Sequence, residues 1–373
     1  FLDVRAASLE EAIEMAKEAK AKKQSLGIGV HGNAAELFPK ALELGWMPDV
    51  ISEMCPCHDP LSYIPAGFTP EEADELRADD RMQYLAVARE SMKRQLSAMI
   101  EFSKKGVAVF EYGTSIRKEC RDAGMPEDEA MSIPGFVAEY IRPLFYLGRG
   151  PFRWTCASGE ANDLSTIDDL VLEMFPHDKS TVKWIELARE HLPIEGLPAR
   201  VCYLGFGERK ALGLRVNELI KSGQIDGPVA FSRDNLDSGS IVNPTFESEN
   251  MLDGSDLISD WPYLNALLNT AAMADLIAIQ ANYSMGEAVH TGVTMIADGS
   301  DEADLRLEAS LTTDSGIGVV RHAQAGYKIA REVAEGKGSL TKEKIKVPLW
   351  WSPKATFGPS DKKDRLGSHI KTD

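Results

Sequence analysis

Carboxylates and hydroxyls stand among apolar side chains in residues 228–269, which read PVAFSRDNLDSGSIVNPTFESENMLDGSDLISDWPYLNALLN. Polar groups packed this closely among apolar ones are usually hydrogen-bonded into a specific geometry. Asp234 and Asp237 follow a predicted strand at 228–232, so both carboxylates can converge on one small site. There one carboxylate could hold an imidazole N–H while the other moves a proton. Three further aspartates precede a predicted helix, and at least one is expected to cap it: Asp253, Asp256 and Asp260.

Arg142 and Arg153 lie in the stretch YIRPLFYLGRGPFRW, where aromatic side chains surround them. A guanidinium group binds a carboxylate through paired N–H bonds, so both arginines are candidates for holding an anionic substrate. The alternative is that each stacks on a ring or closes an internal ion pair.

Cys202 lies in a predicted strand at 199–208. A cysteine in a buried strand is ordinarily inert, so chemistry at Cys202 does not follow from its position alone.

The turn around Asn33 and Ala34 joins a predicted strand at 26–32 to a predicted helix at 33–45. The free amides of a first helical turn can hold an anion, although many such turns only connect a strand to a helix.

The next predicted strand is followed by MCPCHDP at 54–60. A Cys-x-Cys-His cluster suggests part of a metal site, but no second cluster stands at zinc spacing, and we expect no metal.

Strands and helices alternate along the chain, which predicts an α/β fold with a parallel sheet near the N-terminus. Ser8 with Glu11 and Thr69 with Pro70 are helix-start signals. We expect residues 135–155 to be irregular but packed. The other predicted elements are helices at 82–104, 209–222 and 300–313, and strands at 107–113, 276–280 and 293–298.

Composition restricts the class of protein. The chain has 373 residues and a formal net charge of −17, which argues against a surface that follows nucleic-acid phosphates. No run of 18 apolar residues is present, so we expect no membrane span. The first residues lack the features of a signal peptide. The five cysteines form no spaced framework, which favours a reducing, cytoplasmic compartment.

Several motifs, in order over about residues 1–335, together resemble the urocanase (urocanate hydratase) family. They are RDNLDSGS with DGSDLISDWPYLNALLN at 233–269, YGTSIR at 112–117, GPFRW at 150–154, GLPARVC at 196–202 and GVVRHAQAGY at 318–327. The resemblance implies part of a parallel-sheet NAD-binding domain at residues 1–125. It further implies an α/β core domain at 126–340 and leaves an irregular tail at 341–373.

The family adds water to an imidazole acrylate and uses NAD⁺ as an electrophile without net redox change. The resemblance assigns catalytic roles to Cys202, Asp237, Asp234 and Arg153. It assigns substrate binding to Arg153, Arg142, Tyr283 and His290. The residues it places on NAD⁺ are Asn33, Ala34, Met54, Cys55, Pro56, Cys57, His58, Tyr63, Ile64 and Tyr112.

The chain departs from the family pattern at two places. MCPC replaces the family's QTSA before His58, which removes hydrogen-bond donors. The stretch 280–292 is two residues shorter than the family's glycine-rich segment, and Tyr283 cannot allow the close approach that glycine allows. We therefore expect a reshaped pocket for urocanate or a ring-modified urocanate, such as thiourocanate or its S-methyl form. The alternative is a non-catalytic relative that binds NAD or a ligand. A third alternative is an ordinary NAD dehydrogenase, but this sequence contains no glycine-rich dinucleotide-binding fingerprint that would support it.

The resemblance also implies a homodimer that acts on a small molecule, in histidine or ergothioneine catabolism. The family's upstream glycine-rich segments have no counterpart here. We therefore expect the chain to be the C-terminal three-fifths of a longer protein.

Overall fold

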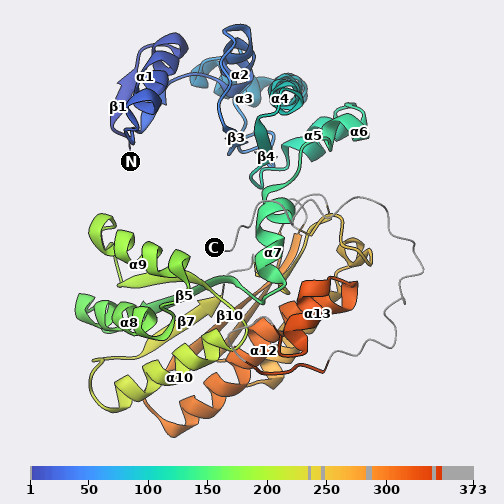
Figure 1. Cartoon of the computed structure of the whole chain (residues 1–373). Helices are drawn as coiled ribbons and strands as arrows, with labels where there is room; N and C mark the ends of the chain where they lie inside the picture. The colour runs from blue at the N-terminus through green and yellow to red at the C-terminus, as the bar shows by residue number, and fades with distance from the viewer. Residues whose placement is uncertain (1, 234–236, 245–247, 283–287, 338–341, 347–373) are drawn as a thin grey trace. The chain divides into compact units, whose positions relative to one another are not determined.

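The computed structural model describes residues 2–233, 237–244, 248–282, 288–337 and 342–346 (Figure 1). The chain divides into two compact units, and two short downstream segments belong to the first. None of the helices in these described ranges is long and apolar enough to cross a membrane. The first unit comprises Phe1–Ile141, Asn243–Glu249 and Ala281–Val289, and the second comprises Arg142–Val242, Asn250–Gln280 and His290–Asp373.

The first unit alternates strands and helices, as predicted for an α/β fold. Its strands form two parallel pairs, β1 with β2 and β3 with β4. Parallel pairing brings the carboxyl ends of β3 and β4 to the same edge. In chain order the elements are β1 (Val4–Ala6), α1 (Leu9–Lys22), β2 (Ile28–Val30), α2 (Ala34–Glu43), β3 (Val50–Glu53), α3 (Pro70–Asp79), α4 (Arg81–Lys104), β4 (Ala108–Glu111), α5 (Ile116–Asp122), α6 (Glu127–Ala130) and a π-helical turn (Val137–Ile141).

Two predicted caps fix the starts of α1 and α3. The Ser8 hydroxyl accepts the Glu11 amide at 3.2 Å, but the Glu11 carboxylate accepts the Ala7 amide, whereas a capping box predicts the Ser8 amide. At α3, where only the Thr69 cap and Pro70 were predicted, the reciprocal pair does close. The Thr69 hydroxyl accepts the Glu72 amide at 3.2 Å, and the Glu72 carboxylate accepts the Thr69 amide at 2.8 Å. Each cap satisfies amides that the first helical turn leaves without partners.

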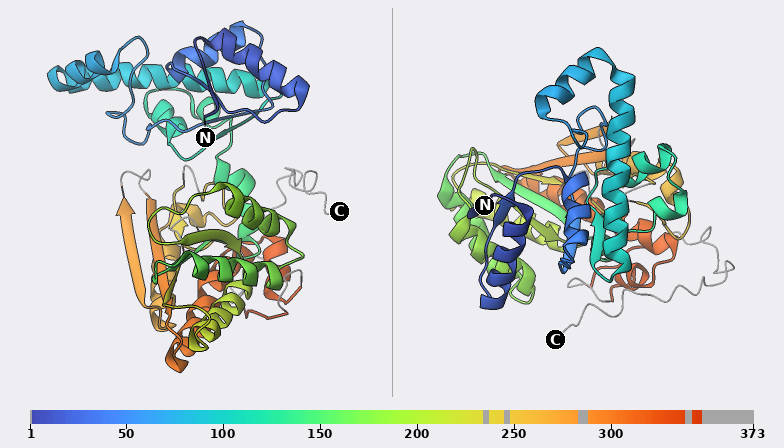
Figure 2. Two further views of the ribbon diagram at one scale, coloured as in Figure 1. Left: turned by 90° about the vertical axis from the view of Figure 1, so that its left-hand side faces the viewer. Right: turned by 90° about the horizontal axis from the view of Figure 1, so that it is seen from above.

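The long helix α4 supplies the centre of the core of the first unit (Figure 2). Tyr84, Ala88, Met92 and Met99 recur at helical spacing on its buried side. Gln95 lies in the same stripe and is fully buried. An amide at an apolar position must find hydrogen-bond partners inside the unit.

A buried ion pair joins the first unit to its downstream segment. Arg117 on α5 contacts the carboxylates of Glu111 and Glu249, the latter at 3.1 Å, and all three side chains are buried. Glu249 also accepts the Gly135 amide at 3.0 Å. The carboxylate that completes this site therefore arrives more than a hundred residues after Arg117 in the chain.

The second unit is built on one sheet with the strand order β6-β5-β7-β10-β8, and β9 pairs with β10. The pairs β5–β6, β5–β7 and β7–β10 are antiparallel. Figure 2 shows β9 and β10, in orange, as a long pair. The elements are α7 (Arg142–Phe145), β5 (Gly150–Cys156), α8 (Ala161–Met174), α9 (Lys179–His191), β6 (Ala199–Leu204), α10 (Glu208–Lys221), β7 (Val229–Arg233), β8 (Ile241–Val242), a 3-10 turn (Ser255–Leu257), α11 (Asp260–Ala271), β9 (Leu276–Asn282), β10 (Ala288–Ala297), α12 (Asp301–Ala325) and α13 (Lys328–Ala334).

Two predictions for this unit were wrong. Residues 135–155 are not irregular, because they contain α7 and the inner strand β5, whose glycine, proline and arginine hide the strand pattern. The helix predicted at 300–313 continues to Ala325 and ends at Gly326, with φ +112°. Small residues lower helix propensity in its second half but permit close packing, since a Cβ on Gly318 would lie 1.6 Å from the Ser238 hydroxyl.

The two faces of this sheet differ. Phe152, Cys202 and Phe231 lie on one face and pack with apolar residues of α8, α9, α10 and α12. We call this the helix-covered face. Side chains alternate along a strand, so Arg153 and its register partners Val201 and Ser232 lie on the opposite face. We call that the second face.

Replacing Thr69 with alanine removes the acceptor for the Glu72 amide and should lower the free energy of unfolding of the first unit by about 1 kcal/mol. Chemical denaturation followed by circular dichroism measures the change. Ser165→Ala is the matched control, because this exposed hydroxyl only bonds back to Ala161 within α8. A loss as large in S165A as in T69A would contradict the role of the cap.

Candidate functional site

The turn between β2 and α2 is held against the segment at Tyr63 and Ile64. Asn33 is the N-cap of α2, and its Oδ1 accepts the Ala35 amide at 2.9 Å. Its Nδ2 donates to the carbonyl of Ile64, also at 2.9 Å. The Ala34 amide, at the first position of α2, is therefore presented at the positive end of a ten-residue helix.

A chain of hydrogen bonds runs from Tyr63 through Gln95 to Cys55. The buried Tyr63 hydroxyl donates to Gln95 Oε1 at 2.9 Å, and burial raises the pKa of this phenol, so it stays a donor. With its oxygen fixed in this way, Gln95 turns its Nε2 to the Cys55 sulfur at 3.2 Å. The buried amide of α4 thus acts as a positioned donor to a cysteine.

Glu53 ends β3 as a buried carboxyl group. The Thr114 hydroxyl donates to its Oε1 at 2.5 Å, and the Cys55 amide donates to its Oε2 at 3.0 Å. Burial raises the pKa of Glu53 to about 7, against the lowering effect of these bonds. A carboxyl group that titrates near neutrality therefore lies directly before the MCPC segment.

The two cysteines of this segment differ in environment. Cys57 is fully buried, and burial raises the pKa of its thiol. Cys55 is half-buried, and its pKa is lowered to about 6, chiefly by the hydrogen bond from the Cys57 side chain and also by Gln95. Cys55 is therefore largely a thiolate at neutral pH.

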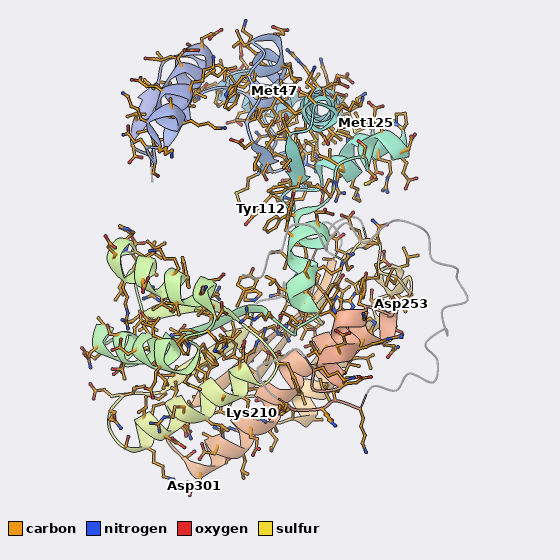
Figure 3. The ribbon with its side chains drawn as sticks, viewed as in Figure 1. Met47, Tyr112, Met125, Lys210, Asp253 and Asp301 are labelled. Atoms are coloured by element: carbon orange, nitrogen blue, oxygen red, sulfur yellow. The ribbon has the colours of Figure 1, made fainter. Side chains whose placement is uncertain are left out.

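The other predicted cofactor residues surround this edge. Met54 and Tyr112 are exposed, and the Tyr112 ring lies 4.7 Å from that of Phe136, just beyond β4 (Figure 3). Pro56 is exposed, and the Nδ1 atom of His58 is buried without a partner. An open helix N-terminus, an unsatisfied ring nitrogen and an exposed aromatic ring together fit a dinucleotide with phosphate and ring groups. Within the described ranges, no cluster of three or more His, Cys, Asp or Glu could hold a metal ion.

Asp237 lies in a network between the sheet and helices α10 and α12. We call Arg209, Arg233, Asp237 and Asp314 the buried ionic network, and each is at most 2% exposed. Arg209 donates to both oxygens of Asp237, at 2.7 and 3.1 Å, and to Asp314 at 2.6 Å. Arg233 donates to Asp314 at 2.7 Å. Burial alone would raise the pKa of Asp314, but the two arginines lower it.

That Asp237 is a general base stays a prediction, and the geometry also gives this residue a structural role. Both of its oxygens accept charge-assisted hydrogen bonds from Arg209. Gly150 presses against the same carboxylate, since a Cβ there would lie 1.8 Å from Asp237 Oδ1. Asp237 therefore holds β5 and α10 together. Its predicted companion Asp234 lies outside the described residues.

Cys202 and Arg153 are not brought together. Cys202 is directly opposite Phe152 and lies on the helix-covered face, whereas Arg153 is on the second face. Burial raises the pKa of the Cys202 thiol to about 12, so it is protonated at neutral pH. A buried, protonated thiol suits a packing role better than nucleophilic chemistry.

Thr294 on β10 pairs with Ser232, which pairs with Arg153, so Thr294 lies on the second face. His290 precedes this paired part of β10 and is buried. Burial lowers the pKa of His290 and keeps its imidazole neutral. Arg142 is buried on α7. Burial raises the pKa of Tyr327, and Arg142 offsets only part of this rise. Tyr283 lies outside the described residues.

Comparison with family models matches both parts of the chain. Residues 1–140 match the urocanase Rossmann-like domain, and residues 143–336 match the urocanase C-terminal domain. The chain belongs to the urocanase family. Membership supports an enzyme of the urocanate hydratase type, a hydro-lyase of histidine catabolism that acts on a small molecule. A Rossmann-like domain in this family is consistent with NAD binding.

The sequence analysis missed four polar residues of these two sites in this urocanase relative. They were detectable in part, because Gln95 and Asp314 each interrupt an apolar stripe on a long helix. Nothing in the local pattern marks the other two, Glu53 and Arg209, whose partners come from distant elements.

Arg209→Met removes the cation between Asp237 and Asp314, so these two buried carboxylates lose a counterion. The expected loss is about 3–5 kcal/mol in the free energy of unfolding of the second unit, measured by chemical denaturation. Arg215→Met on the same helix is the control, because its exposed pair with Glu218 contributes less than about 1 kcal/mol. Equal losses would show that the network does not stabilise the unit.

Native-state alkylation should distinguish Cys55 from the other cysteines. Its rate with iodoacetamide should rise with pH to half its maximum near pH 6, as the thiol ionises, and then level off. Cys120, Cys156 and Cys202 should react only after denaturation, because burial keeps them protonated. Peptide mass spectrometry of each site gives the rates. A Cys55 midpoint above about pH 8, the range of an ordinary thiol, would contradict the assigned environment.

Proposed function

We propose that this chain is part of a hydratase that adds water to a urocanate-like imidazole acrylate, with NAD⁺ as an electrophilic cofactor. The observation that carries the proposal is the match to both urocanase domains in one chain. The substrate is urocanate or a ring-modified form such as thiourocanate or S-methyl-thiourocanate. The departures at 280–292 from the family's glycine-rich segment support a changed ring pocket.

The first unit would hold the dinucleotide at the edge where its strands end. The Ala34 amide at the start of α2 suits a phosphate oxygen, and the unsatisfied His58 Nδ1 can bond a polar group of the cofactor. Tyr112 offers an exposed ring and hydroxyl. When bound, NAD⁺ would supply an electron-poor ring that accepts electron density from the conjugated substrate.

On the second unit, Arg153 would bind the carboxylate of the acrylate. A guanidinium group on the second face of the sheet can give two parallel N–H bonds to one carboxylate and so fix the orientation of the substrate. His290, near the start of β10, would act with Arg153, because burial lowers its pKa and leaves a neutral imidazole that can take up and return a proton. Asp237 and Cys202 would hold and pack the strands that carry these groups.

A second candidate is a relative that binds NAD or a ligand without turnover. One observation supports it, because two residues predicted to do chemistry also have structural surroundings. Asp237 is bound by Arg209 through both oxygens, and Cys202 is a buried, protonated thiol. The two candidates differ in turnover and not in binding.

The decisive experiment measures bound NAD⁺ in the purified protein and the loss of ultraviolet absorbance of urocanate, thiourocanate and S-methyl-thiourocanate. We expect bound NAD⁺ and turnover of at least one acrylate without net formation of NADH. Arg153→Gln should lower kcat/KM by about 10- to 150-fold, the value of a charge-assisted bond. The surface variant Arg215→Gln is the control and should keep full activity.

Bound NAD⁺ with no turnover of any of the three acrylates would favour the non-catalytic candidate. Accumulation of NADH would instead indicate an ordinary dehydrogenase. Failure of the intact protein to bind NAD⁺ at all would contradict both candidates.

A further inference from the structure

We propose that Cys55 and Cys57 form a reversible thiol–disulfide pair, with Cys55 as the residue that reacts with an oxidant and Cys57 as the resolving thiol. The pair lies in the segment that departs from the family's QTSA, so it is a feature of this chain. It is independent of the proposed hydratase activity, since it rests on the contacts of these two side chains.

The backbone brings the two cysteines close together. The Cys57 amide donates to the Cys55 carbonyl at 2.8 Å, which closes a tight turn around Pro56. Cα atoms two positions apart are at most about 7 Å apart, and such a turn shortens this separation toward the range that a disulfide requires. The Cys57 side chain is also the largest influence that lowers the pKa of Cys55.

The surroundings give the two sulfurs different roles. Cys55 is half-buried between exposed neighbours, and its sulfur accepts a hydrogen bond from Gln95 Nε2 at 3.2 Å. The hydrogen bond from the Tyr63 hydroxyl to Gln95 Oε1 sets the orientation of the Gln95 amide. These donors stabilise the Cys55 thiolate, the form that attacks an oxidant. Cys57 is fully buried, so an oxidant reaches it only by way of Cys55.

The chemistry balances with a hydroperoxide as the oxidant. The Cys55 thiolate attacks the peroxide oxygen, the O–O bond breaks, and Cys55 becomes a sulfenic acid while hydroxide or alkoxide leaves. Cys57 then attacks the Cys55 sulfur, the S–O bond breaks, and the Cys57 proton leaves with the hydroxyl group as water. A dithiol reductant reverses the disulfide. Both cysteines are oxidised and the peroxide is reduced by two electrons.

Oxidation would also change the cofactor site, a consequence that rests on the proposed function. A disulfide would draw Cys57 out of its place in the apolar core of the first unit, and would end the contact of Gln95 with the Cys55 thiolate. The segment that carries His58 would then move. The affinity for NAD⁺ should fall by at least about tenfold on oxidation and recover on reduction.

The test treats the intact protein with hydrogen peroxide, alkylates free thiols, and digests it with trypsin. Both cysteines fall in the single fragment 41–77, which contains no other cysteine. We expect this fragment to be two hydrogens lighter and unalkylated after oxidation, and doubly alkylated after reduction. Cys120, Cys156 and Cys202 lie in other fragments and serve as internal controls for general oxidation.

Two variants assign the roles. Cys57→Ser should retain a Cys55 sulfenic acid that dimedone labels, whereas Cys55→Ser should give neither the adduct nor the disulfide. Circular dichroism checks that both fold. A fragment 41–77 that stays doubly alkylatable after peroxide, or dimedone labelling of C55S at Cys57, would overturn the proposal. If the disulfide forms and NAD⁺ binds in neither redox state, the proposed function fails while the thiol pair stands.

Discussion

The second unit depends on the buried ionic network of Arg209, Arg233, Asp237 and Asp314. Four charges with almost no solvent access are tolerable only because each is paired at hydrogen-bond distance. The pairs tie β7 and the turn after it to helices α10 and α12. The same four side chains therefore link the residue predicted to be a base, Asp237, to the stability of the unit.

On the sheet, the residues that stabilise the fold and the arginine proposed to bind substrate lie on different faces. The helix-covered face carries the ionic network and the protonated thiol of Cys202. Two of the helices on this face, α10 and α12, can be found in Figure 3 by the labels Lys210 and Asp301. The second face carries Arg153. In the first unit, the polar groups of the candidate site lie where β3 and β4 end, around Glu53 and Cys55.

Much of the fold was predictable, and the reasons are local. The caps at Ser8 and Thr69 and the strand-to-helix turn at Asn33 depend on neighbouring residues, so the sequence pattern indicated them. The strand β5 escaped prediction because its place in the sheet depends on pairing with β6 and β7, not on its own alternation.

The site was predictable only as a set of residues. The motifs identified Cys202, Arg153 and Asp237, but their assignment to opposite faces follows from strand register, which a motif does not contain. Likewise, the low pKa of Cys55 depends on Gln95, forty residues away, whose orientation is set by Tyr63.

The Glu249 carboxylate that completes the first unit has a consequence for biosynthesis. Arg117 is synthesised long before Glu249, so the N-terminal part of the unit emerges during translation without the second counterion that the buried guanidinium has in the folded unit. An excised fragment ending at Ile141 would lack this counterion permanently. The first unit is thus assembled from segments that lie far apart in the chain, and it can be completed only after Glu249 has left the ribosome.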